Sequence, residues 1–217
     1  MSLTSPWPVP FIIDPNNLAI DAVVSFCVSV LVAIVINAEA QAFVASFMGD
    51  ARPGAKDRFH FNAFLHLDIL GTLSFLVGGF GWPRTMQLDL GKFEHPRLYT
   101  FLARLSGPIA NILMANIAAS LAHVMKIIDY DPRVFVMLIG VNVTMALYNL
   151  IPLPPLAAGS LVYVLIPPSY QRLKWLFLQT GPFIILALLL VERITHQGIL
   201  SPYINPLIVA VSNFIKG

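Results

Sequence analysis

The stretch between Asp21 and Asp50 carries one charged residue, Glu39, and otherwise consists mostly of apolar side chains. At about 1.5 Å per residue, a helix of this length can cross a hydrocarbon core of about 30 Å. Soluble domains carry about 25% charged residues, whereas this 217-residue chain is 11% charged and 57% hydrophobic. We therefore expect an all-α polytopic membrane protein.

Further apolar stretches predict five to six transmembrane helices in total. The second, at 65–81, is short, rich in glycine and interrupted by His66 and Asp68, which indicates a short or broken span. Three more are predicted at 98–125, 134–150 and 175–191. The last, at 199–215, is uncharged but contains two prolines, so it is either a sixth span or an interfacial helix.

The whole chain, 1–217, is predicted to form one membrane domain. Residues 1–17 have no basic segment or cleavage site and suggest an interfacial segment rather than a cleaved signal peptide. A core is expected over 18–165 and C-terminal helices over 166–217. A short alternating stretch makes a hairpin possible in the loop 82–97.

The charge pattern limits the partners. A net charge of +2 without a basic patch excludes nucleic acid, and the apolar composition implies lipid contact. Lys and Arg occur in nearly every loop, so the positive-inside rule does not fix the orientation from the sequence. We expect an integral, multi-pass location, in a bacterial inner membrane.

Five short motifs occur in a fixed order along the chain. The segment "AFVASFMGD" ends the first span, and "FNAFLHLDILGT" (61–72) follows it. Next come "GFGWPR" (79–84), "SGPIANILMAN" (106–116) and "YNLIPLPPLAAGS" (148–160). In this order they resemble the site-2 protease family of intramembrane zinc metalloproteases, and the resemblance covers about residues 20–165.

The resemblance also implies where zinc and the catalytic base would lie. The family carries HExxH on its first core helix, two His for zinc and a Glu for the water. Counting back from Gly49-Asp50 places Asn37 and Gln41 at the His positions and Ala38 at the Glu position. The Asp ligand expected in the proline-rich loop is replaced by Ala157. Amides are poor zinc ligands, so no metal, no zinc cofactor and no catalytic residue are expected.

Glu39 does not restore the motif. It lies one residue after the base position, and one residue turns a helical side chain by about 100°, so Glu39 should point away from the vestigial site. It could be protonated or paired with a basic group such as Arg104. Asn37 and Gln41 fit a packing role between helices. His66, Asp68, Asn111 and Asn149 occupy family positions and are, with Glu39, candidate groove or partner-binding residues.

These observations predict a pseudoprotease. We expect a catalytically inactive binding or structural subunit of a larger membrane protein complex, with other integral membrane proteins as partners. Two alternatives stay open: an atypical metalloprotease with a metal site rearranged onto His66, Asp68, His60 or Glu39, and a regulator that sequesters transmembrane substrates.

Overall fold

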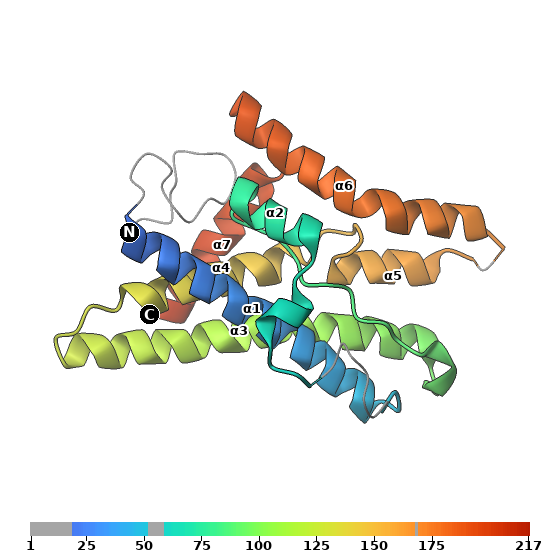
Figure 1. The fold of residues 1–217 in the computed structure, drawn as a ribbon, viewed down its shortest axis with the longest axis horizontal. Helices are drawn as coiled ribbons and strands as arrows, with labels where there is room; N and C mark the ends of the chain where they lie inside the picture. The colour runs from blue at the N-terminus through green and yellow to red at the C-terminus, as the bar shows by residue number, and fades with distance from the viewer. Residues whose placement is uncertain (1–18, 52–58, 168) are drawn as a thin grey trace.

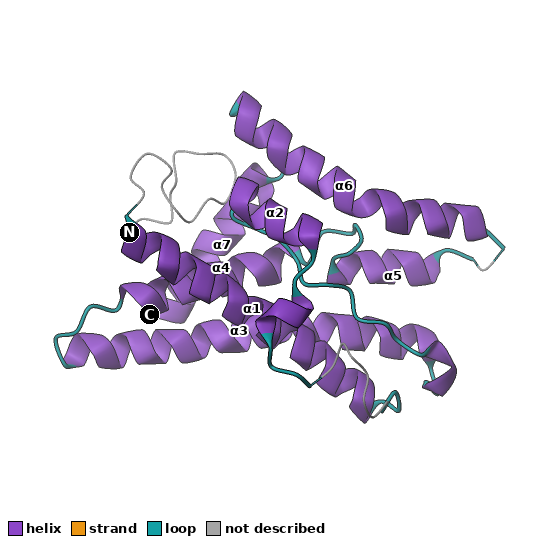
Figure 2. Ribbon diagram, viewed as in Figure 1, coloured by secondary structure: helices purple, strands orange, loops and turns teal. Residues whose placement is uncertain are grey.

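The computed structural model describes residues 19–51, 59–167 and 169–217, and within these ranges the chain is all-α (Figure 2). Seven α-helices and two short 3-10 helices occur in the described residues, in the order α1 (Ile20–Phe47), η1 (Ala63–His66), α2 (Ile69–Gly78), η2 (Leu90–Lys92), α3 (Pro96–Ile127), α4 (Arg133–Tyr148), α5 (Ala157–Leu165), α6 (Gln171–Thr195) and α7 (Ser201–Lys216).

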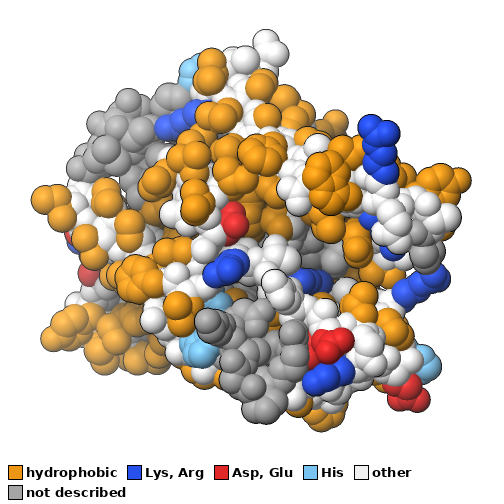
Figure 3. Space-filling view, turned by 45° about the vertical axis from the view of Figure 1, so that its right-hand side comes forward, with side chains coloured by type: hydrophobic (Ala, Val, Ile, Leu, Met, Phe, Trp, Pro, Cys, Tyr) orange, Lys and Arg blue, Asp and Glu red, His pale blue; other side chains and the backbone are white. Residues whose placement is uncertain are grey.

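Three of these helices are long and apolar enough to cross a membrane. α1 has 28 residues, α3 has 32 and α6 has 25, and at about 1.5 Å per residue each exceeds the hydrocarbon thickness of about 30 Å. α2 and α4 are shorter apolar helices. Apolar side chains cover much of the surface in Figure 3. The chain is therefore a multi-pass integral membrane protein, and the count of five to six spans stays a prediction.

α1, α3 and α4 pack against one another and form the centre of the fold, with α1 crossing α3 in Figure 1. Small buried side chains, among them Ala33 on α1 and Ala115 on α3, let the helix backbones approach closely. At Gly107 of α3 a Cβ atom would lie only 2.7 Å from Oδ1 of Asn37 on α1. The polar side chains of α1 are thus pressed directly against α3.

α2 is a short apolar helix of ten residues, where the sequence predicts a short or broken span. The side chain of Asp68 caps its N-terminus, and Gly79, in the left-handed conformation with φ 69°, ends it after ten residues. The chain then turns back across the start of α2: a Cβ atom on Gly71 would lie 2.1 Å from the carbonyl oxygen of Trp82. α2 packs on α6 (Figure 1).

The loop 82–97 forms no hairpin of its own. Its residue Pro83 makes an isolated antiparallel bridge with Leu67, and η2 is its only helical turn before α3 begins at Pro96. The alternating sequence pattern was misleading because this extended segment pairs with a residue that precedes α2. The two strands of a hairpin are joined by a short turn, whereas here a whole helix lies between the paired residues. The predicted interfacial segment 1–17 lies outside the described residues, and the single-domain division stays a prediction.

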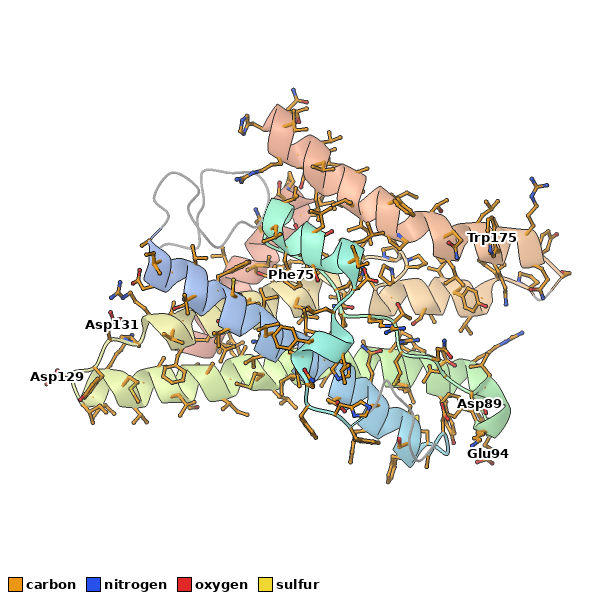
Figure 4. All side chains as sticks on the ribbon, viewed as in Figure 1. Phe75, Asp89, Glu94, Asp129, Asp131 and Trp175 are labelled. Atoms are coloured by element: carbon orange, nitrogen blue, oxygen red, sulfur yellow. The ribbon has the colours of Figure 1, made fainter. Side chains whose placement is uncertain are left out.

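The structure shows which charged residues lie at the same end of the molecule. Asp89 and Glu94 lie at one end of the molecule, and Asp129 and Asp131 lie at the other (Figure 4). Lys92 and Arg97 are close to Glu94 in the sequence, and Arg172 and Lys174 lie just before Trp175, which lies toward the same side in Figure 4. Lys126 and Arg133 are close to Asp129 and Asp131 in the sequence.

We therefore expect the Glu94 end to face the cytoplasm, because positively charged segments are retained there. In a Cys27→Ser background, a membrane-impermeant maleimide added to intact cells should label Tyr130→Cys but not Glu94→Cys. Both positions are exposed, so permeabilised cells should label both and provide the control. The opposite labelling pattern would reverse the orientation.

Candidate functional site

The two positions that the resemblance assigns to zinc ligands lie together on α1 and are bonded to each other. Asn37 and Gln41 are both buried, and their i, i+4 spacing places them on one face of the helix. Nε2 of Gln41 donates to Oδ1 of Asn37 at 2.7 Å. The space between the two side chains is therefore closed by a direct hydrogen bond.

This pair is part of a longer chain of amides that joins three helices. Asn37 Nδ2 donates to Oδ1 of Asn111 on α3 at 2.6 Å. Asn111 Nδ2 donates in turn to Oδ1 of Asn142 on α4 at 2.8 Å, and also to the carbonyl oxygen of Ala33 at 3.0 Å. This series of amides ends on α4, where Asn142 Nδ2 donates to the carbonyl oxygen of Leu138 at 2.9 Å.

At its other end, the series of hydrogen-bonded amides begins at the charged guanidinium group of Arg104. Arg104 of α3 donates through one guanidinium nitrogen to Oε1 of Gln41 at 2.9 Å and through another to the carbonyl oxygen of Met86. Each amide oxygen of the chain thus accepts a hydrogen bond and each amide nitrogen donates one. Buried polar groups that are satisfied in this way fix the helices against one another.

These residues do not fit a zinc ion. Zinc in proteins binds imidazole, thiolate or carboxylate groups at about 2.0–2.3 Å, whereas the facing groups here are amides already engaged with each other. Ala38, at the position of the catalytic Glu, is buried and has no side-chain polar atom. Asn37, Ala38 and Gln41 thus provide no imidazole, thiolate or carboxylate group.

Glu39 points away from the amide chain, as its place in the helix predicts. Its carboxylate accepts the backbone N–H groups of three consecutive residues: Phe59 at 2.7 Å, His60 at 2.8 Å and Phe61 at 3.1 Å. Nε2 of His66 lies 3.0 Å from Oε1 of Glu39. The expected pairing of Glu39 with Arg104 is replaced by two separate contacts, Glu39 with His66 and Arg104 with Gln41.

The anchored loop holds an unusual backbone conformation. Phe59 and Phe61 have φ values of 55° and 47°, in the left-handed region that bulky residues seldom adopt. The adjacent N–H groups converge on the carboxylate, an arrangement that suits an anion. Glu39 therefore ties the segment before η1 to α1 and satisfies backbone groups that apolar surroundings would leave unpaired.

His66 and Asp68 do not form a joint metal pair. His66 turns toward Glu39, whereas Oδ1 of Asp68 accepts the N–H of Gly71 at 2.8 Å and the indole N–H of Trp82 at 3.1 Å. Asp68 thus caps α2 and connects it to the segment that follows. Within the described residues no group of three His, Cys, Asp or Glu side chains is placed to bind a metal ion.

Asn149 organises the proline-rich loop. Its Nδ2 donates to the carbonyl oxygen of Met145, and its Oδ1 accepts the N–H of Ala157 at 3.1 Å. Its own carbonyl oxygen accepts the N–H of Ala158 at 2.9 Å. Ala157, at the position of the third zinc ligand, is therefore the first residue of α5 and is held through its backbone alone.

Sequence reasoning did not single out Glu192, another buried carboxylate, on α6. Its Oε1 accepts the backbone N–H groups of Ile199, Leu200 and Ser201 and holds the start of α7, so it repeats the arrangement at Glu39. A signal was present: Glu192 follows a long uncharged run. An acidic residue there has few ways to be satisfied other than by nearby backbone N–H groups.

The fold and the site define a multi-pass integral membrane protein whose polar centre lies between α1, α3 and α4. A protein of Bacillus subtilis (strain 168) with the name "Putative zinc metalloprotease YwhC" is 30% identical to the chain over 187 residues, which cover 82% of this chain and 84% of that protein. The chain therefore belongs to the site-2 protease family. No protein-family model matches the chain, and no solved structure matches it significantly.

Proposed function

We propose that the chain is a catalytically inactive member of the site-2 protease family and serves as a binding or structural subunit of a larger membrane protein complex. The proposal of catalytic inactivity rests on the hydrogen bond of 2.7 Å between Gln41 and Asn37. It joins the two vestigial ligand positions directly, inside a chain of amides with no carboxylate, imidazole or thiolate.

The other catalytic positions support the same proposal. Ala38 and Ala157 have methyl side chains in place of the base and the third ligand, and both are buried. The scaffold around them is intact: Asn149 holds the proline-rich loop, and Asp68 caps α2. A fold that keeps its framework and lacks its reactive groups is suited to binding rather than to hydrolysis.

The alternative function, an atypical metalloprotease with a rearranged metal site, is less well supported. The backbone N–H groups of residues 59–61 donate to the carboxylate of Glu39. The backbone N–H of Gly71 and the indole N–H of Trp82 donate to the carboxylate of Asp68. Donor hydrogens directed at a carboxylate occupy the positions that a cation would need. The regulator that sequesters transmembrane substrates is a variant of the binding role and differs from it only in the partner.

Metal analysis of the purified protein tests the inactive state. We expect far less than one zinc ion per chain after purification in zinc-containing buffer, because amides do not retain zinc. YwhC, purified in the same way, is the matched control for zinc loading. Stoichiometric zinc that is lost in His66→Ala would contradict the proposal and favour the rearranged site.

Purification in a mild detergent tests the second half of the proposal. The protein should elute with other integral membrane proteins in fixed ratio, and a stronger detergent should separate them. Elution as a monomer under the mildest conditions would leave no support for a subunit role.

A further inference from the structure

The face of α3 that points away from the protein carries a polar stripe. Asn116, Ser120 and His123 are exposed and follow the i, i+4, i+7 spacing that places them on one side of the helix. Apolar side chains flank them: Leu113 is 60% exposed and Ile117 is 54% exposed. α3 runs along one edge of the described fold (Figure 1).

We expect Asn116 to lie at membrane depth, with the end of α3 near the edge of the hydrocarbon core. Eleven residues separate it from Ile127, the last residue of α3, which corresponds to about 16 Å and therefore to about half of a 30 Å hydrocarbon core. Amide groups are costly in contact with lipid chains, and membrane proteins place them where another helix can bond to them.

The helix itself satisfies the stripe only in part. Asn116 Nδ2 donates to the carbonyl oxygen of Ile112 at 2.9 Å, and the hydroxyl of Ser120 donates to the carbonyl oxygen of Asn116 at 3.1 Å. Among the described residues, no hydrogen bond reaches Oδ1 of Asn116. In contrast, Asn111 on the same helix uses both its oxygen and its nitrogen within the amide chain. Asn116 thus has the chemistry of an interhelical contact, but within 19–51, 59–167 and 169–217 no other helix bonds to it.

A positive charge, that of Lys126, lies beyond the stripe toward the C-terminal end of α3. Lys126, ten residues beyond Asn116 and about 15 Å along the helix axis, is exposed and lies within electrostatic range of the exposed Lys216 of α7. A second copy of this chain, packed symmetrically on the same stripe, would bring its own Lys126 and Lys216 toward these lysines. Like charges in proximity disfavour that pairing. A helix with a carboxylate at this level would be complementary.

We propose that Asn116, Ser120 and His123 form a docking surface for a transmembrane helix of another membrane protein. That helix carries an amide or hydroxyl side chain at the depth of Asn116 and a carboxylate near Lys126 and Lys216. The inference names the class of partner for the proposed subunit role, and it does not depend on the loss of zinc.

A synthetic helix in phosphatidylcholine vesicles tests the surface. The probe is a leucine–alanine peptide with one central Asn and a Glu ten residues further on, carrying an acceptor dye; the donor dye is attached through Gly217→Cys in a Cys27→Ser background. Replacing the peptide's Asn by Leu should weaken binding about 3- to 30-fold, the range measured for interhelical polar contacts in membranes. Replacing its Glu by Lys should also weaken binding.

The matching variants of the protein locate the contact. Asn116→Leu should abolish the difference between the Asn and Leu peptides, whereas Leu113→Ile, on the same face, should leave it unchanged. Equal binding of both peptides by the unaltered protein overturns the proposal. Energy transfer between two labelled copies that depends on Asn116 would also overturn it, in favour of a second copy. Because zinc content is measured separately, either result leaves the catalytic proposal standing.

Discussion

Replacing Asn111 by leucine is expected to lower the free energy of unfolding by about 2–5 kcal/mol, since the change removes three buried hydrogen bonds. Asn111 has no exposed surface and bonds to Asn37, Asn142 and the carbonyl oxygen of Ala33. Leucine would leave the amide of Asn37 without an acceptor and the carbonyl of Asn142 without a donor. Reversible unfolding by SDS in mixed micelles measures the loss.

Asn116→Leu is the matched control, because it makes the same change on the same helix at an exposed position. We expect its free energy of unfolding to stay within about 0.5 kcal/mol of the unaltered protein. If Asn111→Leu proved equally mild, the amide chain would contribute little to the packing of α1, α3 and α4, and our explanation for its presence would be wrong.

Replacing Glu39 by alanine is expected to release the segment 59–66 from α1 and to destabilise the protein by about 2–4 kcal/mol, because three part-buried backbone N–H groups and the buried ring of His66 lose their partner. The left-handed conformations of Phe59 and Phe61 should relax once the N–H groups are free. Hydrogen exchange followed by mass spectrometry should show fast exchange at residues 59–61, where the unaltered protein is protected.

Two further variants distinguish local release of residues 59–61 from unfolding of the whole protein. Glu39→Gln keeps one acceptor oxygen and should speed exchange at residues 59–61 while leaving α3 protected. Glu94→Ala removes an exposed carboxylate and should change neither property. Unchanged exchange at 59–61 in Glu39→Ala would show that the loop is held by something other than this carboxylate.

The helices could be predicted because apolar runs define them. The run after Asp21 became α1, and the glycine-rich, interrupted run at 65–81 became the short α2. The relation of Asn37 to Gln41 and the divergent direction of Glu39 followed from the helical period alone. These are local properties of one helix.

The partners of these residues could not be predicted in the same way. Which amide meets Asn37 depends on how α1, α3 and α4 are rotated against one another, and no spacing within one segment encodes that rotation. The N–H groups that bind Glu39 belong to the backbone, which is chemically alike at almost every residue. The loop 82–97 was misjudged for a related reason, since its extended partner, Leu67, lies beyond a turn and a helix.

The amide chain has one further property, which concerns its direction. From Arg104 to the carbonyl oxygen of Leu138, every nitrogen points the same way. Turning over any single amide would bring two oxygens together on one side and two NH₂ groups together on the other. The four side chains can therefore reverse only in concert, and the charge of Arg104, which can donate but never accept, forbids that reversal. A relative sliding of the three helices would break the bonds that cross between them, from Arg104 to Gln41, from Asn37 to Asn111 and from Asn111 to Asn142. The fixed direction of the amides therefore couples α1, α3 and α4 at the two positions that the resemblance assigns to zinc ligands.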